Sequence, residues 1–365
     1  RLLDGLTLEA WSPFLTTSGL RVFGAGAAAV FGDPLERIRV TVEAGALWEI
    51  GDVSRTEPFG SLTLAVAPFE PTLTLQGLTT VAGYGDRFFE PVSGRFFDYF
   101  ERWSRGTFGL SLPLRGLDGG WNLSLRAFFE SRESLDRVNQ YPAGSTLFGF
   151  VLPFEGERIG VEGSVVYDDR PTFRRSVAPE TGVALSLVGR YWPAWLDQPR
   201  GEAALIAGFD ASLSLPAFHV LLLRTRAGAT VDLTTVQSAL LVGQGNDFPV
   251  RGYPSGSQLG EFALSGSFAW RFPLLEVYRG WGATPIYLRV IALELFADAA
   301  TAFGDRSFPA FDWARVLTAV GAELQFQMSW LGAARSTLSV GLAYATEEDP
   351  SDQLSVYAGA SFPLF

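Results

Sequence analysis

The sequence contains no cysteine, no lysine and a single histidine, His219. The lack of cysteine excludes disulfides, thiolate metal sites, iron–sulfur ligation and cysteine nucleophiles. With one imidazole, a histidine-rich metal site is excluded and a Ser-His-Asp triad would depend on one position. All 28 basic residues are arginine and the net charge is −11, so a basic face for nucleic acid is not expected. We predict no metal site, no cofactor and no nucleic-acid partner.

Long apolar runs are also missing, although 47% of the residues are hydrophobic. A membrane-spanning helix needs about 20 apolar residues in succession. The longest candidate, Ile286 to Phe303, is interrupted by Arg289, Glu294 and Asp298. The chain opens at Arg1 without a signal peptide, so we expect a mature or trimmed form. The apolar content must therefore serve a packed or lipid-facing structure that is not built from spanning helices.

The dominant period is two, which is typical of half-buried strands. Near the end of the chain Leu354, Val356 and Ala358 alternate with Ser355, Tyr357 and Gly359. Residues 261–272 and 336–345 alternate in the same way. These runs are about 10 to 13 residues long, whereas strands of soluble proteins have about 5 or 6 residues and transmembrane strands about 9 to 11. The length favours a transmembrane barrel over a soluble sandwich.

Turn-forming residues separate the alternating runs and divide the chain into sixteen expected strands. An even number suits a bacterial single-chain barrel. We predict an all-β fold, a 16-stranded antiparallel transmembrane β-barrel with an inward-folded sixth extracellular loop, as a single domain over residues 1–365. The expected strands are 20–31, 36–48, 58–68, 71–82, 97–114, 120–132, 157–168, 181–191, 203–215, 218–229, 236–243, 260–272, 286–300, 315–328, 335–346 and 353–365.

If the apolar faces of these strands meet lipid, their polar faces must line a filled or wet interior. Glu294, Asp298 and Glu323 would then lie in two neighbouring strands, which is costly unless the carboxylates are paired or hydrated. The best basic partner is Arg251, in the irregular segment before residue 260. A loop that folds inward would pair Arg251 with Asp298 or Glu294. The alternative is that these groups are solvated in a porin-like channel.

The motif Val250-Arg251-Gly252-Tyr253 resembles the loop-six tip of the bacterial surface antigen superfamily, which includes outer-membrane protein assembly factors and two-partner secretion transporters. Downstream, Trp270-Arg271-Phe272-Pro273-Leu274 is similar to the family's strand-12 segment. Leu295-Phe296-Ala297-Asp298-Ala299 is similar to its strand-13 motif. The specific match covers roughly residues 203–365.

This resemblance implies a sixteen-stranded barrel whose loop arginine, Arg251, enters the lumen and meets Asp298. Glu294, Arg271 and Glu323 would be further lumen partners. The last residues fit the family's C-terminal targeting signal, with Tyr357, Gly359, Phe362, Leu364 and Phe365. Three positions depart from the family pattern: Ala269 replaces an acidic residue, and Ala299 and Ala300 stand where glycine is common. Ala269 leaves Asp298 as the main expected partner of Arg251.

The resemblance also implies a function and a place. We expect a barrel in the outer membrane of a diderm bacterium, in contact with the lipid bilayer and a lipopolysaccharide-type outer leaflet. It would handle unfolded polypeptide clients through the lumen or a lateral gate between strands 1 and 16. Strand 1, with Gly24 to Ala29, and strand 16, with Pro363, would form a weak seam. Upstream periplasmic POTRA domains are absent from these residues; such domains or accessory lipoproteins are expected partners.

Two other classes of function stay open. A passive diffusion channel would use the Arg251 loop as a constriction that limits solute size. A membrane-embedded enzyme would need His219, which lies in the apolar run from Phe218 to Leu223. An isolated histidine on such a strand is usually structural, so we predict that the chain is not an enzyme.

Overall fold

The computed structural model describes residues 6–17, 22–33, 37–49, 52–67, 71–90, 95–116, 119–135, 146–147, 154–173, 176–198, 200–231, 238–254, 256–280, 286–304, 310–330, 334–346 and 353–361. These residues form sixteen strands of eight residues or more, three shorter strands and two short 3-10 helices. No helix in the described part of the chain is long and apolar enough to cross a membrane. The fold is all-β, as the alternation predicts.

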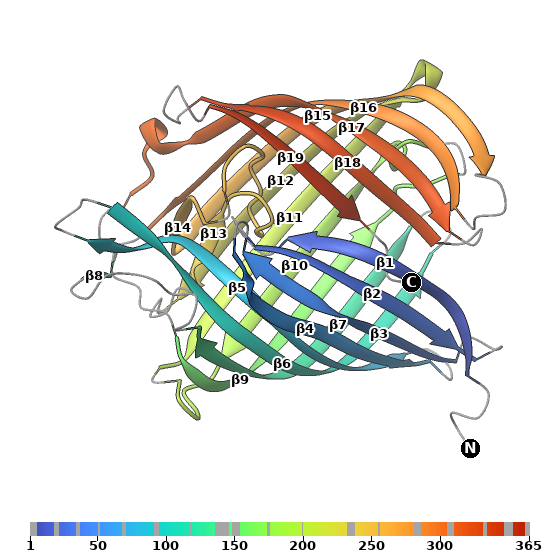
Figure 1. The fold of residues 1–365 in the computed structure, drawn as a ribbon. Helices are drawn as coiled ribbons and strands as arrows, with labels where there is room; N and C mark the ends of the chain where they lie inside the picture. The colour runs from blue at the N-terminus through green and yellow to red at the C-terminus, as the bar shows by residue number, and fades with distance from the viewer. Residues whose placement is uncertain are drawn as a thin grey trace.

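The sixteen long strands make one antiparallel sheet in which each strand pairs with the next long strand along the chain. Figure 1 shows the sheet curling round into a barrel-like wall. The long strands are β1 (Thr7–Thr17), β2 (Val22–Gly32), β3 (Ile38–Glu49), β4 (Asp52–Val66), β5 (Thr72–Glu90), β6 (Arg95–Arg115), β7 (Gly120–Ser134), β9 (Gly156–Asp168), β10 (Gly182–Trp192), β11 (Glu202–Leu215), β12 (His219–Val231), β15 (Phe262–Gly280), β16 (Ile286–Phe303), β17 (Leu317–Trp330), β18 (Ala334–Ala345) and β19 (Leu354–Ser361).

The short elements lie outside this series. β8 (Thr146–Leu147) pairs with β5, while β13 (Leu240–Val242) pairs with β14 (Gln258–Gly260) in a separate two-stranded ladder. The 3-10 helices are η1 (Pro216–Phe218), in the turn from β11 to β12, and η2 (Trp313–Arg315), between β16 and β17. Figure 1 shows β13 and β14 within the curve of the wall, not on its rim.

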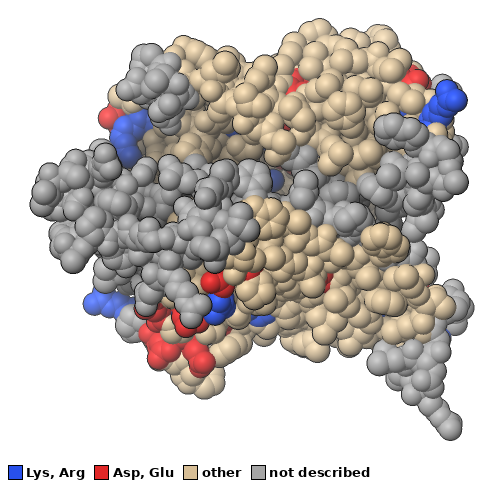
Figure 2. All heavy atoms as spheres, viewed as in Figure 1, with Lys and Arg blue, Asp and Glu red and all other residues tan. Residues whose placement is uncertain are grey.

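The two faces of the sheet differ in polarity, and the apolar face is the outer one. On β11 the side chains of Leu205, Phe209 and Leu213 are exposed, while Glu202 and Ile206 are buried. The other strands repeat this contrast, and Figure 2 shows a broad uncharged wall with charged atoms gathered mainly near its margins. A soluble sheet buries its apolar face in a core, whereas a transmembrane barrel turns that face to lipid. The inner face of the wall is therefore the face that carries polar chemistry.

The strand prediction contains two errors, one strand missed and one wrongly expected, which cancel in the count. The first long strand is β1, which the prediction missed because Ser12-Pro13 interrupts its alternation and reads as a turn. Residues 236–243 were expected as the eleventh strand, but within the described residues 238–243 the strand is Leu240–Val242, and it pairs with β14 instead of the wall. The eleventh strand of the wall is β12. The Arg251 segment still lies between strands eleven and twelve.

The expected seam shifts with this correction. Gly24 to Ala29 belong to β2, which is paired with β1 on one side and β3 on the other, so this small-residue run is not at an edge. Within the described residues, β1 and β19 each have a ladder partner on one side only. Phe362, Pro363, Leu364 and Phe365 lie outside the described residues.

Candidate functional site

Residues 238–260, here called the insert, connect β12 to β15 and pack on the inner face of the wall. The side chains of Val242, Phe248, Val250 and Tyr253 are fully buried there. They share one apolar cluster with five alanines from the inner faces of four neighbouring strands, β15 to β18. These alanines are Ala263, Ala300, Ala302, Ala319 and Ala345. Small side chains on the wall leave the space that the larger side chains of the insert fill. This set of alanines was a signal in the sequence that the prediction did not use.

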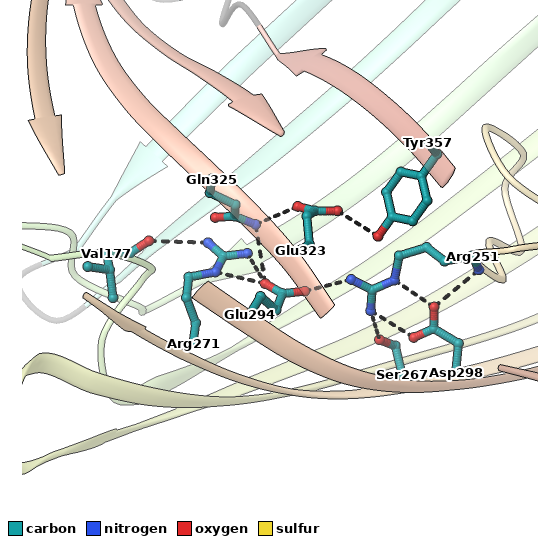
Figure 3. Close-up of polar contacts among 9 residues, drawn as sticks. All are labelled: Val177, Arg251, Ser267, Arg271, Glu294, Asp298, Glu323, Gln325 and Tyr357. Atoms are coloured by element: carbon teal, nitrogen blue, oxygen red, sulfur yellow. Dashed lines mark hydrogen bonds and ion pairs between the residues drawn. The ribbon is translucent and has the colours of Figure 1, made fainter. Parts of the chain in front are cut away.

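Arg251 is the polar centre of the insert, and its guanidinium meets two carboxylates of β16. Nε and Nη2 donate to the two oxygens of Asp298 at 2.7 and 2.8 Å, and Nη1 donates to Glu294 at 2.7 Å. Nη2 also donates to the hydroxyl of Ser267 at 3.2 Å (Figure 3). The backbone N–H of Arg251 donates to Asp298 at 3.2 Å. Every arm of the guanidinium is engaged, with Asp298 in the fork geometry that arginine prefers.

The strand places these partners on one face because its side chains alternate. Glu294, Phe296 and Asp298 are successive inward positions of β16, and all three are buried. The Phe296 ring lies between the two carboxylates along the strand, with the guanidinium carbon of Arg251 3.5 Å from its centroid. Burial alone would lower the pKa of Arg251, but its hydrogen bonds and ion pairs with Asp298 and Glu294 raise that pKa above its usual value. Arg251 is therefore a permanent cation in this site.

The two residues after Arg251 explain the rest of the motif. Gly252 has φ of +90°, and a Cβ there would lie 3.0 Å from the Cβ of Ala343, so the backbone conformation and the close packing both favour glycine. Tyr253 is buried with its hydroxyl donating to the carbonyl of Thr318 at 3.1 Å. The motif therefore combines a charged anchor, a tight turn and an aromatic anchor.

The remaining lumen residues named from the sequence belong to the same network (Figure 3). Arg271 donates to Glu294 through Nε at 2.7 Å and also through Nη2. Glu323 accepts from the Gln325 amide at 2.7 Å and from the Tyr357 hydroxyl at 3.0 Å. Tyr357, expected as part of a terminal signal, is thus an inward residue of β19 that contacts this network. Gly359 lies in β19, and Ala269 is buried on the inner face of β15.

A second inward loop, which the sequence did not predict, approaches this network from the opposite end of the wall. It is the β9–β10 loop, described over residues 169–173 and 176–181. Ser176, Val177 and Ala178 are buried, and Val177 packs in a cluster with Val220, Leu222 and Phe296. Its carbonyl accepts from Arg271 at 3.2 Å and from Gln327 at 2.5 Å. Arg271 therefore joins this loop to Glu294, which in turn binds Arg251 of the insert.

The insert has a further ionic contact on another part of the wall. Asp247 accepts from Nη1 of Arg190, on β10, at 3.1 Å, and Arg190 also donates to Glu162 of β9 at 2.8 Å. Arg251 and Asp247 thus tie the insert to β16 and to β10. Two anchors on separate strands fix its orientation better than one.

Comparison with solved structures identifies the architecture. BamA from Haemophilus ducreyi, solved without POTRA domains 1–3, aligns over 98% of this chain and 70% of its own length, with a TM-score of 0.56 and 14% identity. CdiB from Escherichia coli aligns over 98% of this chain and 63% of its own, with a TM-score of 0.62 and 13% identity. The chain has the fold of BamA and CdiB. The resemblance to the surface antigen superfamily is confirmed at the level of the fold.

CdiB from Acinetobacter baumannii aligns equally widely, over 98% of this chain and 60% of its own, with a TM-score of 0.57 and 9% identity. No family model matches the sequence, and no curated protein does. The chain spans between 60% and 70% of the length of these three neighbours. The neighbours are outer-membrane barrels of Gram-negative bacteria. At these identities the likeness extends to the fold, and it covers the first half of the chain as fully as the second.

Proposed function

We propose that this chain is an outer-membrane barrel that inserts or translocates polypeptides, using its lumen or the seam between β1 and β19. The observation that carries the proposal is the docking of Arg251 on Asp298 and Glu294. A polypeptide-handling barrel needs a wall that stays folded while its interior admits a client. A buried ionic anchor can hold the insert in one position until a client or a partner displaces it.

The edges of the sheet support the seam as a second route. Among the described residues, the outer edges of β1 and β19 have no ladder partner. β1 contains Pro13, which has no N–H to donate to a neighbouring strand. Unpaired edge groups are the usual site at which an extended peptide adds to a sheet. A client strand would pair with such an edge through its backbone, which requires no particular sequence.

Photo-crosslinking in the outer membrane of a Gram-negative host tests this proposal. One variant carries the crosslinking residue at Val356, on the outer face of the edge strand β19, and another carries it at Ser265, on the inner face of β15. The matched control carries it at Leu187, on the outer face of β10 within the wall. We expect polypeptide adducts at Val356 or Ser265 and none at Leu187. Adducts at all three positions, or at none, would contradict polypeptide handling.

The alternative is a passive diffusion channel with the insert as its constriction. The inner face offers charged groups for such a channel, and the net charge of −11 would favour cations. However, the interior is entered by the insert from one end and by the β9–β10 loop from the other. Liposome swelling distinguishes the two functions: rapid entry of neutral sugars, without polypeptide adducts in the cell, would favour the channel.

A further inference from the structure

A chamber of about 510 Å³ lies between the two inward loops. Pro249 and Arg251 of the insert line one side, and Arg170 and Pro179 of the β9–β10 loop line another. Its charged lining consists of five arginines, Arg170, Arg224, Arg226, Arg251 and Arg271. The carboxylates in the lining are Asp210, Glu294, Asp298 and Glu323. The chamber is therefore locally cationic in a chain whose net charge is −11.

Three of the four carboxylates already have close partners. Asp298 gives both oxygens to Arg251, and Glu294 is shared between Arg251 and Arg271. Glu323 accepts from Gln325 and Tyr357. The fourth, Asp210, has an oxygen 3.6 Å from Nη1 of Arg170. Arg251, Arg271 and Arg170 therefore each lie beside a carboxylate of the chamber lining.

Arg224 and Arg226 remain. They are successive inward positions of β12, and neither guanidinium makes a hydrogen bond or ion pair with a residue that the structure describes. Arg224 stands opposite Asp210 and Ser267 in the ladder, so a carboxylate lies nearby. Arg226 stands opposite Gly208 and Ser265, which bring no charge and little volume. Arg226 therefore lines the chamber without a carboxylate opposite it in the ladder.

We propose that this chamber binds a small soluble oxyanion, a phosphate or a carboxylate, through Arg226 and Arg224. Two guanidiniums on one strand face present several N–H donors to the same point, which suits an anion with two or more oxygens. The hydroxyl of Ser265, opposite Arg226, is placed to donate a further hydrogen bond. Enclosure between the loops favours a small anion over a lipid headgroup that carries acyl chains. This site does not depend on the polypeptide-handling function.

The test uses the full chain folded in detergent and inorganic phosphate as the probe, with isothermal titration calorimetry against sodium chloride at equal ionic strength. We expect a saturable isotherm. Arg226→Gln removes charge-assisted hydrogen bonds without leaving a carboxylate unpaired, and should weaken binding by about tenfold or more. Arg226→Lys should retain part of the affinity. The matched control Arg279→Gln, at an exposed position on β15, should leave the affinity unchanged.

Retained heat-modifiability on a gel shows that each variant is folded. No saturable heat with phosphate beyond the chloride control would overturn the site, as would equal affinity in Arg226→Gln and the unaltered chain. A loss of affinity in Arg279→Gln equal to that in Arg226→Gln would show non-specific attraction and would also overturn it. Parallel titrations with acetate and with vesicles of an anionic phospholipid separate a carboxylate and a lipid headgroup from free phosphate.

Discussion

At the scale of the residue, the stability of the insert depends on the guanidinium of Arg251. The side chains of Asp298 and Glu294 are 3% and 1% exposed, so removing Arg251 leaves buried Asp298 without its cation and leaves Glu294 with Arg271 alone. Breaking a buried pair commonly costs about 3 to 5 kcal/mol. We predict that Arg251→Ala lowers the free energy of unfolding by about that amount. Urea unfolding of the refolded barrel in detergent measures it.

The control for this substitution is Arg279→Ala, on the exposed end of β15, which should change the free energy of unfolding by less than about 0.5 kcal/mol. Equal midpoints for Arg251→Ala and Arg279→Ala would contradict the structural role of Arg251. Arg251→Lys is expected to fall between the two, because an ammonium cannot form the fork that joins both oxygens of Asp298.

Asp33 offers a pH-dependent prediction outside the strands. Its carboxylate accepts from the backbone N–H groups of Ile38, at 2.8 Å, and Arg37, at 2.5 Å, and these bonds hold its pKa below the usual value. A lowered pKa stabilises the β2–β3 turn above the unfolded pKa and loses that effect as pH falls through the folded pKa. We expect hydrogen exchange of Ile38, corrected for intrinsic rates, to become less protected below about pH 4. The variant Asp33→Asn should lack that pH dependence; an unchanged profile would contradict the assignment.

Contacts of the site could be predicted where a sequence motif supplies a basic residue and nearby inward carboxylates require one. The contacts of Arg251 with Asp298 and Glu294 follow from carboxylates on inward positions, which need a basic partner, and from the resemblance of the Arg251 motif. The roles of Val177 and Gln327 could not be found this way, because a backbone carbonyl as the acceptor leaves no mark in the sequence. The inward direction of Tyr357 agrees with the alternation of residues 354–359, but its hydrogen bond to Glu323 was not predicted, because a terminal motif does not name the partner of its aromatic residue.

At the scale of elements, the β9–β10 loop is the second plug of the interior. The N–H of Glu180 donates to the carbonyl of Pro171 at 2.8 Å, so the two ends of the loop lie side by side. Replacing residues 172–179 with two glycines should therefore leave β9 and β10 paired. We predict a larger single-channel conductance in planar bilayers for this variant. Phe173→Ala, at an exposed position of the same loop, is the control and should conduct like the unaltered chain; equal conductance of all three would show that the loop does not restrict the lumen.

The edge strands lead to a further prediction. β1 and β19 have ladder partners on one side, whereas β11 and β12 are paired on both sides. We expect backbone amides of β1 and β19 to exchange with deuterium about tenfold faster or more, a difference of about 1.4 kcal/mol in opening free energy. Mass spectrometry of the folded barrel in detergent provides the rates. Equal protection of all four strands would contradict a weak seam.

Strand prediction succeeded where apolar and polar residues alternate without a break. It failed at a proline within a strand and at an apolar run that lies inside the barrel. β15, β16 and β18 were placed within a few residues at their N-terminal ends because their apolar positions recur without a break. β1 was missed because of Pro13, and 236–243 was overextended because an apolar run inside the barrel resembles a wall strand. Alternation in the sequence indicates that one face of a strand is apolar, but it does not show whether that face packs against lipid, the wall or another segment inside the barrel.

For the whole molecule, the fold class could be predicted because lipid and water impose opposite patterns on a sheet. Long strands with exposed leucine and buried glutamate have few soluble counterparts, and the agreement with BamA and CdiB over 98% of the chain shows the same architecture. The plugged interior and the unpaired edges are the features on which the proposed function depends.

A double charge reversal between Arg251 and Asp298 tests the docked insert most directly. Glu294 also binds Arg251, so a simple swap would place two carboxylates together; the measurement is therefore made in a Glu294→Gln background. We predict that Arg251→Asp and Asp298→Arg each abolish heat-modifiability and function in the outer membrane, and that the double variant restores both. Silent single variants, or a double variant no better than either single one, would contradict an insert held inside the barrel by Arg251.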